Sequence, residues 1–321
     1  MKRFALQIFL FLMLVALVVC IPGVIFERLA MKTTNVSPYA RINEVNDMKD
    51  VDADLIILGN SRAEMGYDDS LMTGLCGMKC LNLAYGGYSF DYEYHIMYES
   101  YLKHNKKPEY IIVDVGPIVF FDHNKPVYNI QMLPYLNRSE FDFYIDLCPQ
   151  LTKAHKILPI KYFGKMAKVM KEINRLMYPE EKYTKKKRKV QWNKKKDFYG
   201  KPQPLENNKT IIELFGRFLD ECKSQNIRVI LVCSPLHTND GLKYFDMKGF
   251  WNIVMWCNKD TQFTMATYQD YFGNDTLCFS DPGHLNEYGK QLFTTKLIHD
   301  LDSVGIINNK KQIKCTPNEP S

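Results

Sequence analysis

The apolar residues of this chain fall into short runs that alternate with longer amphipathic or polar stretches. Four runs have the length and aliphatic content of strands buried on both faces: residues 55–58, 79–84, 110–115 and 227–233. Four segments between or after them have the pattern of helices: residues 90–104, 211–225, 249–259 and the stretch after Asn286. Strands and helices that alternate at this spacing form parallel crossovers. We therefore expect an α/β fold, a three-layer α/β/α sandwich with a mostly parallel, flavodoxin-like sheet.

A long apolar segment precedes this pattern. Residues 4–26 are apolar with three interruptions, and Lys2 and Arg3 come before them. About 20 apolar residues cross the ~30 Å hydrocarbon core, whereas a cleaved signal has an apolar region of only ~7–15 residues. We expect residues 1–29 to form a transmembrane anchor, and a cleaved signal is the alternative. Because basic residues stay in the cytoplasm, the rest of the chain is expected outside it, in the periplasm or at the cell surface.

The remaining boundaries follow from changes in composition. Residues 30–52 are polar without clear periodicity and are predicted to be a tether. The α/β domain is expected over residues 53–306, and residues 307–321 form a polar tail. A basic insertion at about residues 150–205 interrupts this domain.

The insertion carries most of the positive excess of a chain whose net charge is +6. Residues 160–177 have apolar positions at helical spacing, Phe163 among them, and predict an amphipathic helix. Two lysine-rich runs follow, at residues 185–189 and 194–196. Such runs are usually solvated, and beside an anchor they can also meet anionic lipid or glycan. Nucleic acid is not expected as a partner, because the anchor places this segment outside the cytoplasm.

The cysteines predict neither a metal site nor a cofactor. The chain has nine, of which Cys20 lies in the anchor. Cys76 and Cys80 are close enough in sequence to pair outside the cytoplasm, although spacing alone does not fix connectivity. No Cys or His spacing is typical of zinc, so we expect no metal and no cofactor.

One serine follows the first strand in a position suited to chemistry. Gly59 permits a tight turn after residues 55–58, and Ser61 then lies at the carboxyl end of the strand, where open α/β sheets keep their active sites. A nucleophilic serine needs a base and a group that orients it. Of two loop histidines, His237 and His284, only His284 has a carboxylate three residues before it, Asp281. The alternative is a serine that only caps the next helix.

These motifs resemble the SGNH (GDSL) hydrolase superfamily. Gly59-Asn60-Ser61-Arg62 is similar to its first block, and Asp281-Pro282-Gly283-His284 is similar to its last, Asp-x-x-His block. The resemblance implies Ser61 as the acylated nucleophile, His284 as general base and then acid, and Asp281 as its orienter. It also implies an oxyanion hole, in which Gly86 or Gly87 supplies an N–H. The superfamily's Gly-x-Asn-Asp block is absent, because Asp114-Val115-Gly116-Pro117 follows the third strand. Asn60 is then the substitute donor to consider.

The anchored setting also resembles SGNH-like proteins that move acyl groups onto envelope polymers. We therefore expect a serine esterase or O-acyltransferase that acts on acyl esters of envelope or extracellular carbohydrate. The acyl group is expected to be acetyl. The alternative is a catalytically weak accessory module that presents glycan to a membrane acyltransferase. The absent asparagine block and the basic insertion favour this alternative.

Overall fold

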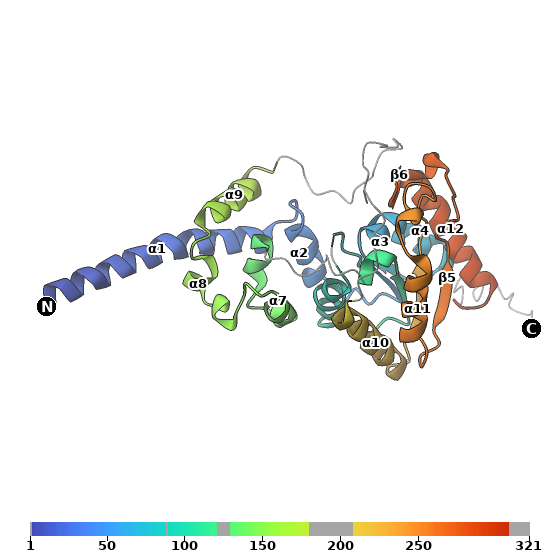
Figure 1. Ribbon diagram of the computed structural model, residues 1–321, viewed down its shortest axis with the longest axis horizontal. Helices are drawn as coiled ribbons and strands as arrows, with labels where there is room; N and C mark the ends of the chain where they lie inside the picture. Colours follow the sequence, from blue (N-terminus) through green and yellow to red (C-terminus); the bar gives the residue numbers. More distant parts are fainter. Residues whose placement is uncertain (1, 88, 121–128, 180–207, 308–321) are drawn as a thin grey trace, which may run out of the picture. The chain divides into compact units, whose positions relative to one another are not determined.

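The computed structural model describes residues 2–87, 89–120, 129–179 and 208–307. The chain divides into two compact units (Figure 1). Unit 1 comprises Met1–Asp47 and Lys125–Lys185, and unit 2 comprises Met48–Asn124 and Lys186–Ser321. The predicted lysine-rich runs, at residues 185–189 and 194–196, lie outside the described residues, as does the tail after residue 307.

Unit 2 is built on a five-stranded parallel sheet in the order β2-β1-β3-β4-β5. Its strands are β1 (Leu55–Leu58), β2 (Cys80–Asn82), β3 (Tyr110–Asp114), β4 (Arg228–Cys233) and β5 (Thr264–Thr267). The four predicted strands are confirmed. Sequence reasoning missed β5, a partly exposed edge strand without an aliphatic run. A separate antiparallel pair is formed by β6 (Phe279–Asp281) and β7 (His284–Leu285).

Helices cover both faces of this sheet, so the predicted α/β sandwich is confirmed (Figure 1). On one face, α12 (Glu287–Ser303) and α4 (Asp69–Cys76) pack Phe293, Leu297 and Met72 against inward residues of the strands. On the other face, α5 (Phe90–Tyr92) packs the Phe90 ring edge-on against Phe215 of α10 (Lys209–Ser224), with centroids 5.0 Å apart. The other helical elements of unit 2 are α3 (Ser61–Gly66), η1 (Glu93–Tyr98), α6 (Glu99–Leu102), η2 (Pro117–Phe120), η7 (Leu242–Tyr244), α11 (Met247–Cys257) and η8 (Thr276–Cys278).

Unit 1 is helical. Its elements are α1 (Lys2–Lys32), α2 (Tyr39–Asp47), η4 (Ile130–Tyr135), η5 (Ser139–Phe141), α7 (Asp142–Leu147), η6 (Lys153–Lys156), α8 (Leu158–Tyr162) and α9 (Met166–Met177). Helix α1 is the one described helix that is long and apolar enough to cross a membrane. Buried tyrosines fill the core of the unit. The Tyr135 ring stacks on Phe141, and its hydroxyl donates to Asn43 Oδ1 at 2.9 Å.

Unit 1 differs from the sequence-based expectation in two places. Residues 30–52 were expected to be a tether, but they contain α2, which buries Tyr39, Ile42 and Val45. These side chains recur every three residues, which gives a short helix one apolar face. The single helix predicted over residues 160–177 is two helices, α8 and α9, separated by Gly164 at φ +70°. Phe163 was expected among the inward positions, but it is 67% exposed.

Candidate active site

The turn after β1 presents Ser61 at the carboxyl edge of the sheet. A Cβ on Gly59 would lie 2.5 Å from the Cβ of Ala63 and 3.0 Å from that of Asp114, so only glycine fits this close approach. Asn60 then caps α3, because its Oδ1 accepts the Arg62 N–H at 3.0 Å. Ser61 is thereby the first residue of α3, and its own N–H lies at the amino end of that helix.

A tight hairpin brings the predicted acid and base together. Strands β6 and β7 are joined by Pro282 and Gly283, and Asp281 and His284 lie directly opposite each other in the pairing register. Opposite residues of an antiparallel pair have neighbouring side chains. The Asp281 carboxylate also accepts the Gly283 N–H at 3.1 Å, which holds its Oδ1 toward the turn.

Hydrogen bonds link these residues in one series. Ser61 Oγ lies 2.8 Å from His284 Nε2, and His284 Nδ1 lies 2.7 Å from Asp281 Oδ1. Asp281 and His284 are buried, and Ser61 is partly exposed. The structure therefore brings together the three residues that the sequence predicted, although Ser61 and His284 are more than 220 residues apart in the chain. Their order is suited to proton transfer from serine to imidazole.

Further contacts hold the hairpin, and they include the helix cap that the sequence predicted at Asn286. Asn286 caps α12 through its Oδ1, and its amide donates to the Leu277 carbonyl at 2.7 Å. Gly289 lets the helix approach this loop, since a Cβ there would lie 2.1 Å from the Cys278 carbonyl oxygen. His237, the other loop histidine, donates its backbone N–H to the Pro282 carbonyl at 3.2 Å. His237 thus supports the turn that carries Asp281 and His284.

Gly86 lies against Ser61. A Cβ on Gly86 would come 3.2 Å from Ser61 Cβ and 2.5 Å from Glu64 Oε2. The Gly86 N–H, however, donates to Glu64 Oε2 at 3.1 Å. Glu64 lies one helical turn after Ser61 on α3, so its carboxylate and the Ser61 hydroxyl share a helix face. Gly87 is exposed, with φ +90°.

Arg62 occupies the space beside Gly116. A Cβ on Gly116, just after β3, would lie 2.2 Å from Arg62 Nη1. The same guanidinium donates to Ser234 Oγ at 2.9 Å, and Ser234 Oγ donates to Asp114 Oδ2 at 2.8 Å. All three side chains are buried, and they tie together the ends of β1, β3 and β4.

Two buried carboxyl groups near this edge have raised pKa values. Burial raises the pKa of Asp114, and the Arg62 guanidinium opposes that rise. Burial also raises the pKa of Glu93 well above its usual value, and the neighbouring carboxylates Asp114 and Asp91 add to the rise. Neither Glu93 oxygen has a hydrogen-bond partner within the part of the chain that the structure describes.

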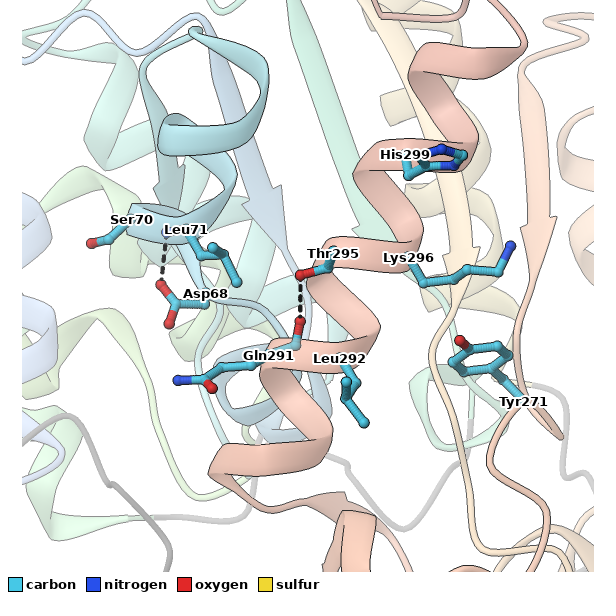
Figure 2. A pocket seen from close by; sticks show the side chains of 9 residues that line it. All are labelled: Asp68, Ser70, Leu71, Tyr271, Gln291, Leu292, Thr295, Lys296 and His299. Atoms are coloured by element: carbon cyan, nitrogen blue, oxygen red, sulfur yellow. Dashed lines mark hydrogen bonds between the residues drawn. The ribbon is translucent and has the colours of Figure 1, made fainter.

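Within residues 2–87, 89–120, 129–179 and 208–307, no group of three or more His, Cys, Asp or Glu side chains is arranged to hold a metal ion. A surface pocket lies elsewhere, between α12 and the start of α4 (Figure 2). Side chains such as Gln291 and Tyr271 line it, and Ser61, His284 and Asp281 do not.

Comparisons with known proteins place solved esterases among the structures that this chain is similar to. No family model matches the chain, and no curated protein matches it. One solved structure is an acetyl xylan esterase, AlAXEase, with 13% identity and a TM-score of 0.40, over 77% of this chain and 99% of that one. Another is a family two carbohydrate esterase from Clostridium thermocellum in complex with cellohexaose, with 8% identity and a TM-score of 0.39, over 80% of this chain and 66% of that one. Both TM-scores are below 0.5.

Proposed function

We propose that this chain is a serine-dependent esterase or O-acyltransferase that acts on acyl esters of envelope or extracellular carbohydrate. Acetyl is the acyl group that we expect. The observation that carries the proposal is the unbroken series from Ser61 Oγ through the imidazole of His284 to Asp281 Oδ1. A serine hydroxyl becomes a useful nucleophile when a base within hydrogen-bond reach takes its proton. The carboxylate beside that base stabilises the imidazolium which then forms.

In the acylation step, Ser61 Oγ attacks the ester carbonyl carbon, and the proton of the Ser61 hydroxyl passes to His284 Nε2. The carbonyl oxygen becomes an oxyanion, and the tetrahedral intermediate collapses as the C–O bond to the alcohol breaks. His284 returns the proton to the departing alkoxide, which leaves as a sugar hydroxyl. Asp281 keeps its negative charge throughout, 2.7 Å from His284 Nδ1.

The second step runs the same chemistry in reverse. A water molecule or a second sugar hydroxyl gives a proton to His284 and attacks the acyl-serine. The bond from the acyl carbon to Ser61 Oγ breaks, and His284 returns the proton to that oxygen. Water gives hydrolysis and a sugar hydroxyl gives transfer. The acyl-enzyme is common to both reactions.

The oxyanion needs donors beside Ser61. We assign the Ser61 N–H, at the amino end of α3, and the Gly86 N–H, which lies against the nucleophile. Because Glu64 accepts the Gly86 N–H at 3.1 Å, its carboxylate has to withdraw before this N–H can serve. The Asn60 Oδ1 is committed to the helix cap, so only its amide nitrogen is left to contribute.

The occupied Gly86 N–H favours a second function. A domain in which Ser61, His284 and Asp281 are hydrogen-bonded, but with one donor held by Glu64 and no Gly-x-Asn-Asp block after β3, suits a slow or inactive module. Such a module would present glycan to a membrane acyltransferase partner, which would perform the turnover.

Covalent labelling separates the two functions. The full chain in detergent is treated with a fluorophosphonate and digested, and the labelled peptide is mapped by mass spectrometry. The enzyme predicts a label on Ser61 that is lost in His284→Ala. Ser70→Ala, which removes an exposed serine on α4, is the matched control and should label normally. A folded chain that neither labels nor hydrolyses p-nitrophenyl acetate would favour the accessory module.

We further propose that α1 anchors the chain in the cytoplasmic membrane and that the α/β domain lies outside the cytoplasm. Helix α1 spans 31 residues, and Lys2 and Arg3 mark its cytoplasmic end. Protease added to sealed right-side-out membranes should then digest the domain. Protection of the domain would reverse this orientation.

A further inference from the structure

Part of unit 1 packs along the apolar helix α1 at one level. A Cβ on Gly23 would lie 2.7 Å from the Tyr162 ring of α8. The Phe26 ring meets the Tyr162 ring edge-on, with centroids 5.8 Å apart, and Lys161 Nζ lies 2.7 Å from Glu27 Oε1. Helix α8 therefore lies beside residues 23–27 of α1, whereas the amino-terminal part of α1 is bare (Figure 1).

The side of α8 away from these contacts is apolar and exposed. Ile157, Ile160 and Phe163 are 57%, 41% and 67% exposed. Ile160 lies in α8 (Leu158–Tyr162), and Ile157 and Phe163 are the residues just before and just after it. We call these three residues the α8 apolar face. By contrast, Lys161 and Tyr162 on the opposite side are buried against α1.

The level of α8 coincides with the expected boundary of a bilayer. Exposed apolar side chains of α1 run from Phe4 to Ile25, a stretch of 22 residues. At ~1.5 Å per residue this stretch is about 33 Å long, close to the ~30 Å hydrocarbon core. Its far end lies within one turn of Gly23, the residue on which α8 packs. The α8 apolar face is thus at the depth where acyl chains give way to headgroups.

The charges around α8 fit lipid headgroups. Residues 153–171 contain six lysines and no acidic residue. Lys161 is used in the pair with Glu27, and Lys153, Lys168 and Lys171 are exposed. Exposed apolar side chains flanked by lysines are typical of segments that lie in the membrane interface, where anionic headgroups attract them.

We propose that the α8 apolar face inserts into the interface of the bilayer that α1 spans, with anionic headgroups around its lysines. This inference rests on the proposed membrane anchor. It gives unit 1 two attachments to the same bilayer, one spanning and one interfacial.

Photocrosslinking tests the inference in the full chain. p-Benzoylphenylalanine replaces Phe163, and the protein is reconstituted in vesicles of equal parts phosphatidylcholine and phosphatidylglycerol, irradiated and analysed for lipid adducts by mass spectrometry. The same substitution at Phe11, within α1, reports on the anchor. The matched control is Tyr178, an aromatic residue that is 68% exposed in the same unit. It lies just after α9, whose Arg175 bonds to the Ser37 carbonyl beyond the end of α1.

We expect lipid adducts at positions 11 and 163 and none at 178. An adduct at 11 without one at 163 would overturn the interfacial contact while leaving the anchor intact. No adduct at 11 would refute the anchor, and the inference with it. A crosslinked protein dimer at 163 in place of a lipid adduct would assign the α8 apolar face to a second copy of the chain and overturn the inference. Equal adducts at 163 and 178 would do the same, because contact would then not depend on depth.

Discussion

The charge of Asp281 offers the sharpest test of the proposed chemistry. Asp281→Asn keeps the shape of the side chain and removes one negative charge. The oxygen that now accepts the Gly283 N–H at 3.1 Å and faces His284 Nδ1 at 2.7 Å can be an amide oxygen. The opposite amide rotamer would point a donor at the Gly283 N–H, so the hairpin selects the productive one. The imidazole orientation is therefore retained and the charge alone is lost.

The expected loss follows from the geometry. In the transition state His284 becomes a cation whose charge centre is about 4 Å from the carboxylate. At an effective dielectric constant of ~20 this attraction is about 4 kcal/mol. Since ~1.4 kcal/mol changes a rate tenfold, kcat/KM should fall by roughly 10³. Both groups are buried, which limits screening by solvent.

The assay is hydrolysis of p-nitrophenyl acetate by the full chain in detergent, with circular dichroism to confirm that each variant is folded. Asp275→Asn is the matched control, because Asp275 is a nearby capping carboxylate that bonds to the Leu277 N–H. It should leave the rate unchanged. A folded Asp281→Asn variant whose kcat/KM stays within tenfold of wild type would refute the role assigned to this carboxylate.

Three further outcomes are expected. Gly86→Ala adds a methyl group that collides with Ser61 and Glu64, so kcat/KM should fall about 10²-fold. Gly74→Ala is the control and should leave kcat/KM unchanged, because a Cβ there meets no atom within 4 Å. Equal losses in the two variants would contradict this prediction. Glu93 has a raised pKa in the folded chain, so the folded state keeps this proton to a higher pH than the unfolded chain, and stability falls as pH rises above about 4.3. Glu93→Gln should therefore raise the melting temperature by roughly 3 °C or more at pH 8 and less at pH 4, and a gain independent of pH would count against it. The sulfurs of Cys76 and Cys80 are 3.7 Å apart, and the hydrogen bond from Cys80 lowers the pKa of Cys76 to about 7. A mild oxidant should join Cys76 and Cys80 in a disulfide at a rate that rises through pH 7, and mass spectrometry should show the loss of two hydrogens. A rate that rises around pH 8.5 instead would argue against the lowered pKa of Cys76.

Local patterns made part of this molecule predictable. The strand, glycine and serine around Ser61 are contiguous, and Asp281 and His284 belong to one hairpin, so short-range chemistry revealed each half of the site. That the two halves meet was implied by the resemblance to the SGNH superfamily, because Asp281 and His284 lie on an antiparallel hairpin outside the parallel sheet. The β5 strand, Thr264–Thr267, lacked any such signal, because its residues are neither strongly apolar nor fully buried.

The features that were missed depend on contacts between distant residues. Arg62, Asp114 and Ser234 are ordinary polar residues in sequence, and only the sheet order places them side by side. Phe163 has the spacing of an inward residue, and the break at Gly164 turns it outward. The occupation of the Gly86 N–H by Glu64 depends on how a loop after β2 meets α3, which no periodicity encodes.

Under the proposed function, the carboxylate of Glu64 also sorts substrates by charge. It lies beside the Gly86 N–H and one helical turn from Ser61, so even after it withdraws from that N–H, acyl groups that reach Ser61 pass close to it. Acyl groups with a carboxylate of their own are repelled there, neutral acetyl groups gain nothing, and acyl groups with an ammonium are attracted. A panel of p-nitrophenyl esters that differ only in acyl charge should therefore be hydrolysed in the order cationic, neutral, anionic. Glu64→Gln should reduce the differences in hydrolysis rate between these esters. Under the proposed function, this one side chain therefore makes the site selective for the charge of the acyl group.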